Sequence, residues 1–302
     1  MLGSIHQAED SVQESYLRAW RAFNTFSGGS FRAWMYKIAT NACLNAIEAR
    51  KVVERLLPHQ LGPSTTRMPD AVPPTDIAWL EPYPDSLLDG AIGNTSNPEA
   101  RFATRESVQL AFVALVQQLP ARQRATLLLC DVLGWTSAEA ATAFGTSTAA
   151  INSALQRGRA TLSKRYPERR PSRASGDQRE LLRRYISAWE KHDVSGFVAL
   201  LSEDASFTMP PWLQWYVGRE VIGSFFTEAW KSCGGLRLVE TAANGQPALA
   251  VYQYEQSASG ERFVAHAIHV LTVEQDAIIG ITAFQPPGGP ELFHFFGLAQ
   301  TL

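Results

Sequence analysis

A proline-rich, acidic segment at residues 61–98 divides this chain of 302 residues. The segment holds seven of the chain's 17 prolines, and one basic side chain against five acidic ones. Proline fixes φ and lacks a backbone N–H, so such a stretch resists regular structure and is typical of a linker. A second break runs from Pro167 to Asp177. The sequence therefore predicts modules at 1–60, 99–166 and 178–302, joined by linkers at 61–98 and 167–177.

The composition is that of a globular protein without a membrane span or a cysteine framework. Hydrophobic residues make up 45% of the chain, yet no apolar run approaches the roughly 18 residues of a membrane helix. Cys43, Cys130 and Cys233 lie far apart, so neither a disulfide framework nor a zinc site is expected. The first residues carry no export signal. We expect a cytoplasmic protein that uses no metal or cofactor and has no membrane partner.

The charge is distributed unevenly along the chain. Residues 99–175 carry a net charge of +6, from eleven basic and five acidic side chains, whereas residues 176–302 carry −6. A basic segment next to an acidic one indicates that the first contacts a polyanion and the second does not. Random clustering of charge explains the same numbers, and charge alone does not separate the two.

The first module is predicted to be helical. Its first helix has an apolar face with helical spacing at Ala8, Val12, Tyr16, Ala19 and Trp20. We expect Trp20 to be buried in the core, because tryptophan usually buries most of its ring. After the loop sequence Ser-Gly-Gly-Ser, a second helix is expected from about Phe31 to Arg50, with Trp34, Ile38, Leu44 and Ile47 buried.

The second module is predicted to contain a helix-turn-helix. Thr136-Ser-Ala-Glu139 fits the capping box of a short helix, Gly145 supplies the turn, and a longer helix follows through Ile151. The outward positions of this longer helix are Thr148, Asn152, Ser153, Gln156 and Arg157. Asn and Gln suit adenine, and Arg suits guanine or phosphate, so this face is fit for readout of DNA in the major groove. A solvated helix face is the alternative.

The third module is predicted to be α+β. An opening helix buries Leu181, Leu182, Tyr185, Ile186 and Trp189, and a later helix contains residues 221–230. A short strand is expected at 206–209, and four more at 236–241, 248–254, 263–271 and 277–283, broken by Asn-Gly and Ser-Gly turns. Helices followed by such strands indicate an antiparallel sheet with helices packed on it.

Five segments of the first and second modules resemble a known family. The segments AEDSVQESYLRAW at 8–20 and FRAWMYKIATNA at 31–42 resemble region 2 of sigma-70 family RNA polymerase sigma factors of the extracytoplasmic-function group. The segments LPARQRA at 119–125, GWTSAEAA at 134–141 and INSALQRGR at 151–159 resemble region 4. The resemblance covers about half the chain, in the expected order. Region 2 in the family normally begins with a further helix, so this region looks N-terminally short.

The resemblance implies roles for the matching positions. Asp10, Gln13 and Glu14 match the motif that grips the polymerase clamp, and Phe26, Trp34, Lys37 and Asn41 match the part that melts and captures the −10 element. Aromatic stacking with a few cations is a sound way to hold unstacked bases. Asn152, Ser153, Gln156 and Arg157 match the region 4 positions that face the −35 element, and the outward Thr148 is expected to contact the same element. A solvated face for the acidic residues, and packing between helices for Trp34, remain alternatives.

Module three resembles the SnoaL-like branch of the nuclear-transport-factor-two-like superfamily, a cone-shaped α+β domain around a pocket, chiefly in Tyr185 to Trp189 and Gly218-Arg-Glu. The motif WLEPYPDSLL at 79–88 looks like that of a sigma-factor subgroup whose tail tunes transcription. Three residues apart on a strand, His266 and His269 should face opposite sides, so only one can line a pocket. Five aromatics either line a cavity or form core: Trp212, Trp215, Tyr216, Tyr252 and Phe284. No nucleophile with an adjacent base is visible, and no catalytic residue is expected.

The sequence therefore predicts a multidomain protein, with all-α sigma regions 2 and 4 followed by a SnoaL-like α+β domain. Its expected partners are core RNA polymerase and promoter DNA, with a possible small-molecule ligand in the C-terminal pocket. The expected function is promoter recognition and transcription initiation, with the acidic tail holding region 4 off DNA. The alternatives are a DNA-binding regulator that never engages polymerase, and a SnoaL-like cyclase or isomerase fused to a DNA-binding module.

Overall fold

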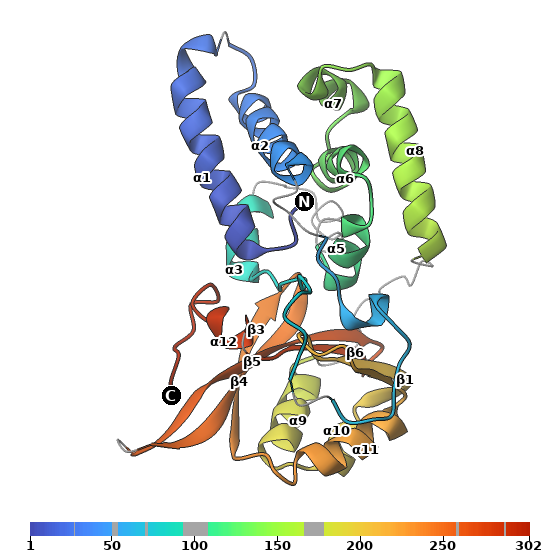
Figure 1. Ribbon diagram of the computed structural model, residues 1–302, viewed down its shortest axis with the longest axis vertical. Helices are drawn as coiled ribbons and strands as arrows, with labels where there is room; N and C mark the ends of the chain where they lie inside the picture. Colours follow the sequence, from blue (N-terminus) through green and yellow to red (C-terminus); the bar gives the residue numbers. More distant parts are fainter. Residues whose placement is uncertain are drawn as a thin grey trace. The chain divides into compact units, whose positions relative to one another are not determined.

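The computed structural model describes residues 1–26, 28–49, 54–69, 72–92, 108–165, 178–257, 260–286 and 288–302. The chain forms two compact units (Figure 1). The N-terminal unit consists of Met1–Leu56 and Ile92–Arg169, and the C-terminal unit of Leu57–Ala91 and Arg170–Leu302. The linker predicted at residues 167–177 lies outside the described residues.

The N-terminal unit is helical, as predicted. Its elements are α1 (Ile5–Ala22), a 3-10 turn (Phe23–Thr25), α2 (Phe31–Glu48), α5 (Leu110–Gln117), α6 (Ala121–Leu127), a π-helical turn (Leu128–Val132), α7 (Ser137–Phe144) and α8 (Thr148–Arg165). Serine side chains cap the first two helices. Ser4 Oγ accepts from the Gln7 amide and Ser30 Oγ from the Ala33 amide, which satisfies backbone donors that a helix start leaves unpaired.

Packing joins α2 to the helix-turn-helix within this unit. Helix α2 contacts both α6 and α7, and the rings of Tyr36 and Trp135 meet edge to face with centroids 5.8 Å apart. The buried guanidinium of Arg124 donates to the Met1 carbonyl at 2.6 Å and to the Gln117 side chain at 3.0 Å. These contacts bring the predicted region 2 and region 4 into one compact body.

The C-terminal unit is built on a six-stranded sheet in the order β2-β1-β6-β5-β4-β3. Its strands are β1 (Leu201–Thr208), β2 (Trp215–Val217), β3 (Leu236–Ala243), β4 (Gln246–Ser257), β5 (Gly260–Glu274) and β6 (Ala277–Phe284). The expectation of an antiparallel sheet is wrong at one junction, because β1 pairs with β6 in parallel. The short strand β2 was not expected.

Three helices pack on one face of the sheet: α9 (Gln178–Glu190), α10 (Val194–Val198) and α11 (Arg219–Ala229), with α12 (Gly288–Glu291) beside β5 (Figure 1). The core between helices and sheet is rich in aromatic rings. Trp189 contacts Phe226 and Trp230 with ring centroids 5.0 Å and 5.4 Å apart, and Phe197 is fully buried. Such edge-to-face pairs add to the free energy gained by burying the rings.

Residues 57–91, from the predicted proline-rich linker, dock on this unit. They contain a 3-10 turn (Pro58–Gln60) and most of α3 (Asp85–Ile92). The Thr65 amide donates to the Trp215 carbonyl at 2.9 Å, and the Trp215 indole N–H donates to the Gly62 carbonyl at 2.9 Å. Leu80 is fully buried. The segment is largely irregular, as its composition predicts, yet it is an integral part of the C-terminal unit.

The other end of this segment pairs with the β3–β4 hairpin. Asn244 and Gly245 both have positive φ, as the predicted Asn-Gly turn requires. The Tyr83 amide donates to Asn244 Oδ1 at 2.7 Å, and the Asn244 amide donates to the Tyr83 carbonyl at 2.8 Å. The Gly245 amide donates to Asp85 Oδ1 at 2.8 Å. The segment is therefore fixed to the unit at two separate places.

Candidate functional site

The helix-turn-helix forms as predicted. Thr136 Oγ1 accepts from the Glu139 amide at 3.2 Å, and Glu139 Oε2 accepts from the Thr136 amide at 2.8 Å, completing the capping box that begins α7. Gly145 ends α7 with φ of 61°, a left-handed conformation that favours glycine. Ile151 and Leu155 of α8 are buried against Ala140 and Ala141 of α7. This packing fixes which side of α8 faces outward.

All five predicted contact residues on α8 are exposed: Thr148, Asn152, Ser153, Gln156 and Arg157. Arg159 is different. Its guanidinium donates to both oxygens of Asp131, at 3.0 Å and 2.5 Å. This pairing raises the pKa of Arg159 and neutralises its charge locally. Asp131 therefore holds Arg159, whereas the α8 face at 148–157 is open.

The predicted −10 residues gather at the start of α2. The rings of Phe26 and Trp34 lie 5.3 Å apart, and Phe31 lies 5.8 Å from Phe26 and 5.7 Å from Trp34. Phe31 was not singled out from the sequence, although its side chain is 51% exposed. Lys37 and Asn41 are exposed further along the helix. A partly exposed aromatic cluster at the start of a helix that also carries a cation is suited to stacking on an unpaired base.

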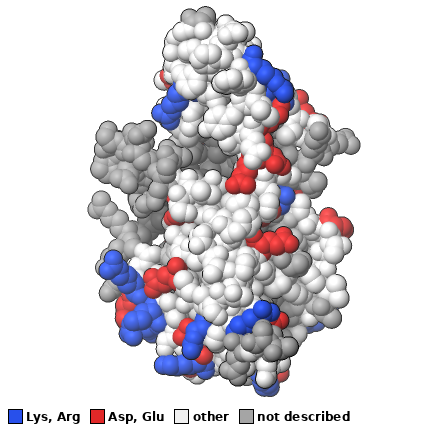
Figure 2. All heavy atoms as spheres, turned by 90° about the vertical axis from the view of Figure 1, so that its left-hand side faces the viewer, with Lys and Arg blue, Asp and Glu red and all other residues white. Residues whose placement is uncertain are grey.

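Large side chains on the predicted apolar face of α1 are exposed. Trp20 is 82% exposed and Tyr16 65%, so the expectation of a buried Trp20 is wrong. Only Ile5, Ser15 and Ala19 of the helix are buried, because α2 covers a narrow stripe of it. Figure 2 faces α1 and shows a broad uncharged area there, bordered by acidic and basic side chains.

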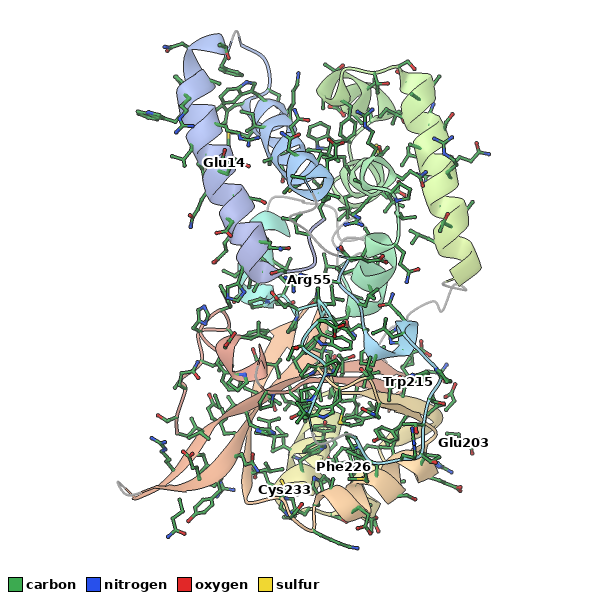
Figure 3. All side chains as sticks on the ribbon, viewed as in Figure 1. Glu14, Arg55, Glu203, Trp215, Phe226 and Cys233 are labelled. Carbon is green, nitrogen blue, oxygen red and sulfur yellow. The ribbon has the colours of Figure 1, made fainter. Side chains whose placement is uncertain are left out.

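The three predicted polymerase-binding residues also lie on α1. Asp10 and Gln13 are exposed. Glu14 is half-buried and accepts a hydrogen bond from Arg18 Nε at 2.7 Å, one turn further along the helix (Figure 3). The helix thus presents acidic and amide groups beside large exposed rings, a combination typical of a protein-binding surface.

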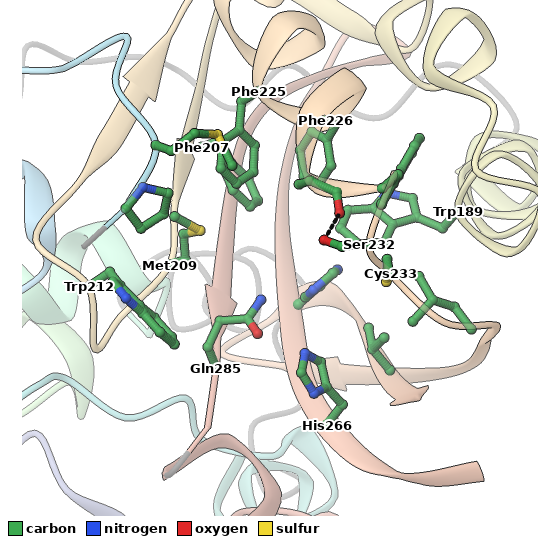
Figure 4. A pocket seen from close by; sticks show the side chains of 17 residues that line it. Trp189, Phe207, Met209, Trp212, Phe225, Phe226, Ser232, Cys233, His266 and Gln285 are labelled. Atoms are coloured by element: carbon green, nitrogen blue, oxygen red, sulfur yellow. Dashed lines mark hydrogen bonds between the residues drawn. The ribbon is translucent and has the colours of Figure 1, made fainter. Parts of the chain in front are cut away.

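The C-terminal unit encloses a cavity of about 480 Å³ between the sheet and α11 (Figure 4). Its wall is mainly aromatic and aliphatic, with polar side chains at Ser232, His266, His269 and Gln285. Met68 and Pro69, from the docked segment, form part of its wall. A volume of this size and an apolar lining with a few polar groups are typical of small-molecule sites.

Both histidines line this cavity, so the expectation that they face opposite sides is wrong. Val251 pairs with Ala267 while the next residue, Tyr252, pairs with Ala265. His266 is therefore the extra residue of a β-bulge, which shifts the alternation by one and turns its side chain to the same side as His269. A sequence alone does not show such a bulge, because the register depends on the partner strand.

The two histidines have different surroundings. His269 is 1% exposed, and its Nδ1 lies 3.0 Å from the Tyr185 hydroxyl. Burial, and then the charge on His266, lower the pKa of His269 to about 3. Burial lowers the pKa of His266 as well, against a hydrogen bond with Gln285 that raises it. Both rings are neutral at pH 7.

The aromatic residues named from the sequence divide between cavity and core. Trp212 lines the cavity. Tyr252 and Tyr216 are buried, and their hydroxyls donate to the carbonyls of Ala299 and Arg67, respectively, each at 2.9 Å. Trp215 lies on β2 beside the docked segment (Figure 3). Among the described residues, no group of three His, Cys, Asp or Glu side chains is placed to hold a metal ion, and no helix is long and apolar enough to cross a membrane.

Comparisons with known proteins support the assignment of sigma regions 2 and 4 and of a SnoaL-like domain. Three family models match this chain: "Sigma-70 region 2" over residues 1–52, "Sigma-70, region 4" over 109–162 and "SnoaL-like domain" over 182–281. The ECF RNA polymerase sigma factor SigG of Mycobacterium tuberculosis is 42% identical over 309 residues, which cover 100% of this chain and 80% of SigG. SigJ of the same organism is 26% identical over 212 residues, covering 69% of this chain and 58% of SigJ.

The fold of the whole chain also has a relative among solved structures. The crystal structure of the extracytoplasmic function sigma factor SigJ from Mycobacterium tuberculosis matches with a TM-score of 0.62 and 21% identity, and the match covers 98% of this chain and 93% of that chain. Sigma regions 2 and 4 in order, a SnoaL-like domain behind them and full-length similarity to SigG together establish the family. The chain belongs to the extracytoplasmic-function group of RNA polymerase sigma factors, and it directs polymerase to promoters for transcription initiation.

Proposed function

We propose how the described residues divide the work of a sigma factor among three surfaces. The α8 face at Thr148, Asn152, Ser153, Gln156 and Arg157 contacts the −35 element. The aromatic cluster of Phe26, Phe31 and Trp34, with Lys37 and Asn41, receives an unpaired base of the −10 element. Asp10, Gln13 and Glu14 on α1 contact the polymerase clamp.

The observation that carries this proposal is the orientation of α8. Ile151 and Leu155 pack against α7 and Ala154 is buried as well, so the side carrying the five polar residues is exposed. An exposed row of amide, hydroxyl and guanidinium groups on the second helix of a helix-turn-helix is what direct readout in the major groove needs. Arg157 is the cation of this row, and bidentate contact with guanine is its most specific use.

The first experiment compares Arg157→Ala with Arg159→Ala. A promoter is first selected from a library by transcription with core polymerase, and binding and run-off transcription are then measured on it. Arg157→Ala should weaken −35-dependent binding by about 1–3 kcal/mol, roughly 5- to 150-fold. Arg159→Ala is the matched control on the same helix, and it should cost less because Asp131 already pairs with that charge.

The promoter itself separates base contact from phosphate contact. If Arg157 contacts a base, one base-pair substitution in the −35 element should weaken binding of the unmodified chain but not of the Arg157→Ala variant. A penalty that is equal with and without Arg157 at every −35 position would assign the residue to phosphate only. Equal losses for the Arg157 and Arg159 variants would remove the proposed role of the α8 face.

The α1 surface is tested separately with purified core polymerase. Asp10→Ala combined with Gln13→Ala should reduce co-elution of the chain with core polymerase, because both side chains are exposed on α1. Glu9→Ala, an exposed acidic residue on the same helix, is the control. A chain that binds promoter DNA but never co-elutes with polymerase would favour a regulator acting alone.

We also propose that the C-terminal unit regulates transcription through the segment it holds. Residues 57–91 connect the two parts of the N-terminal unit along the chain, and they are hydrogen-bonded to β2 and to the β3–β4 hairpin. Docking shortens the free chain available between region 2 and region 4. Release of this segment should therefore change promoter-dependent transcription. Holding of region 4 by the acidic tail stays a separate prediction, tested by the salt dependence of transcription.

A further inference from the structure

We propose that the cavity of the C-terminal unit, with Met68 and Pro69 in its wall, binds a neutral, flat, apolar ligand with an acceptor oxygen that takes a hydrogen bond from Nε2–H of His269. The proposal names the class of signal for the regulatory role above. It rests on that role only in its last step, where ligand binding holds residues 65–69 in place.

The lining sets the size and polarity of the ligand. The cavity measures about 480 Å³, and none of the described residues that line it is Asp, Glu, Lys or Arg. A charged ligand would lose its hydration without gaining an opposite charge, which is costly. Phe225, Phe226, Trp189 and Trp212 present rings to the space (Figure 4). Rings of this kind pack well on the faces and edges of a flat apolar molecule.

His269 supplies a directed polar contact. Its Nε2 is buried, has no hydrogen-bond partner among the described residues, and belongs to a side chain that lines the cavity. On the other side of the ring, Nδ1 lies 3.0 Å from the hydroxyl of the fully buried Tyr185. A buried donor without a partner is costly, so this nitrogen points to a missing ligand group.

The hydrogen bond with Tyr185 decides which kind of group is missing. If the Tyr185 hydroxyl donates to Nδ1, its proton is satisfied, and the neutral imidazole carries its own proton on Nε2. The opposite tautomer leaves the buried Tyr185 proton without its described partner. The favoured tautomer therefore leaves an unpaired N–H donor on a ring that lines the cavity, and the matching ligand group is a carbonyl or ether oxygen. With its proton on Nε2, His269 serves as a donor and not as a general base.

Met68 and Pro69 couple the ligand to the docked segment. They line the cavity, and they follow Arg67, whose carbonyl accepts a hydrogen bond from Tyr216 at 2.9 Å. A ligand that contacts these two side chains adds to the contacts that hold this part of the segment. Undocking of residues 65–69 then requires loss of those contacts or of the ligand.

The probe for the test is prodan, a neutral naphthalene with one ketone oxygen and environment-sensitive fluorescence. Its partner is 2-dimethylaminonaphthalene, which lacks the ketone. Both are titrated into the full chain without polymerase or DNA, and energy transfer from tryptophan reports binding. His269→Phe should weaken prodan binding about fivefold, as expected for one hydrogen bond of about 1 kcal/mol from a neutral group, and should leave the ketone-free probe within about twofold. Tyr185→Phe removes the hydroxyl that keeps the His269 proton on Nε2. It should therefore also lower the preference for prodan over the ketone-free probe.

A filled cavity is the second arm. Ala229→Phe places a ring in the cavity and should abolish binding of both probes, whereas Ser224→Phe adds the same ring to the exposed side of α11 and should leave binding unchanged. Circular dichroism confirms that each variant is folded. Binding of prodan that survives Ala229→Phe, or equal affinities for the two probes in the unmodified chain, would overturn the proposal. The proposal would also be overturned if neither probe bound to the unmodified chain.

Hydrogen exchange tests the last step. At ten times its Kd, prodan should slow exchange of the Thr65 amide and its neighbours through 69 by about tenfold, because undocking then competes with binding. The Asn244 amide, at the other attachment of the segment, is the internal control. Prodan binding without slower exchange at 65–69 removes the coupling but leaves the site. Because no polymerase or promoter is present, these outcomes do not depend on the roles proposed for α1, α2 and α8.

Discussion

His269 is a buried histidine whose neutrality is a consequence of the fold. Its Nδ1 lies 3.0 Å from the Tyr185 hydroxyl, His266, Cys233 and Gln285 line the same cavity, and none of these supplies a negative charge at neutral pH. Burial, followed by the charge on His266, lowers the pKa of His269 to about 3, against about 6.5 in the unfolded chain. Protonation therefore favours the unfolded state.

This difference predicts how stability depends on pH. Between pH 6.5 and pH 3 the unfolded chain binds more protons at His269 than the folded chain, so the free energy of unfolding falls as the pH falls. At pH 5 the loss from this residue is about 2 kcal/mol. Urea unfolding at pH 7 and pH 5 measures it, and the difference should be about 2 kcal/mol smaller in His269→Gln. If wild type and variant lose the same free energy, other groups carry the dependence. Lowering of the His266 pKa acts in the same direction and remains in the variant.

Residues whose environment is set by their own helix were predictable from the sequence. The outward positions of α8 follow from helical periodicity once Ile151 and Leu155 are assigned to the core, and all five are exposed. The prediction that Trp20 is buried was wrong, because its burial depends on which elements cover α1, and the local sequence pattern does not show that. The orientation of His266 depends on a bulge in the pairing of β5 with β4, and so it was not predictable either.

At the scale of elements, the capping box decides where α7 begins. Thr136→Ala removes the hydroxyl that accepts from the Glu139 amide and should lower the stability of the N-terminal unit by about 1 kcal/mol. Thr142→Ala is the matched control within α7. Its hydroxyl donates to the Ala138 carbonyl at 3.0 Å, a contact that helices do not need, so this change should be neutral or slightly stabilising. Thermal unfolding of both variants gives the comparison, and equal losses would show that the cap is not what stabilises α7.

For the docked segment, composition predicted the irregular backbone but not the attachment to the C-terminal unit. Seven prolines and net negative charge indicate irregular backbone, and most of the segment is irregular. Its attachment depends on single partners such as Asn244, which lies more than 150 residues further along the chain. Composition carries no signal for pairing over such a distance. Strand β2, three residues long, was missed for the same reason, since pairing with β1 alone defines it.

Asn244→Gly tests this attachment. Glycine keeps the positive φ of 57° and the backbone N–H that donates to the Tyr83 carbonyl, and it removes the side chain whose Oδ1 accepts from the Tyr83 amide. One lost hydrogen bond of about 1 kcal/mol should raise hydrogen exchange near Tyr83 about fivefold. Exchange at Thr65, on the other attachment, is the control and should not change. No increase near Tyr83 would mean that Asp85 and Leu80 hold this end of the segment without help from the Asn244 side chain.

On the scale of the whole molecule, the N-terminal unit is too compact to span a promoter. Elements named −10 and −35 lie about 25 base pairs apart, about 85 Å at 3.4 Å per base pair. In the structure, α2, which carries the predicted −10 residues, contacts α6 and α7 directly, and the rings of Tyr36 and Trp135 are 5.8 Å apart. Simultaneous contact with both elements requires this packing to break. On the roles proposed above for α2 and α8, the structure represents a closed form, and opening adds a cost to promoter binding.

Loosening the contact between Tyr36 and Trp135 should lower that cost. An edge-to-face aromatic pair contributes about 0.5–1.5 kcal/mol, so Trp135→Ala should increase the affinity of the free chain for duplex promoter DNA by about two- to tenfold. Small-angle scattering should show a larger radius of gyration without DNA. Trp135→Phe keeps a ring against Tyr36 and is the control. Because the two rings act through one contact, the gains from Trp135→Ala and Tyr36→Ala should not add in the double variant. Additive gains, or a larger radius with unchanged affinity, would show that the contact does not restrain promoter binding.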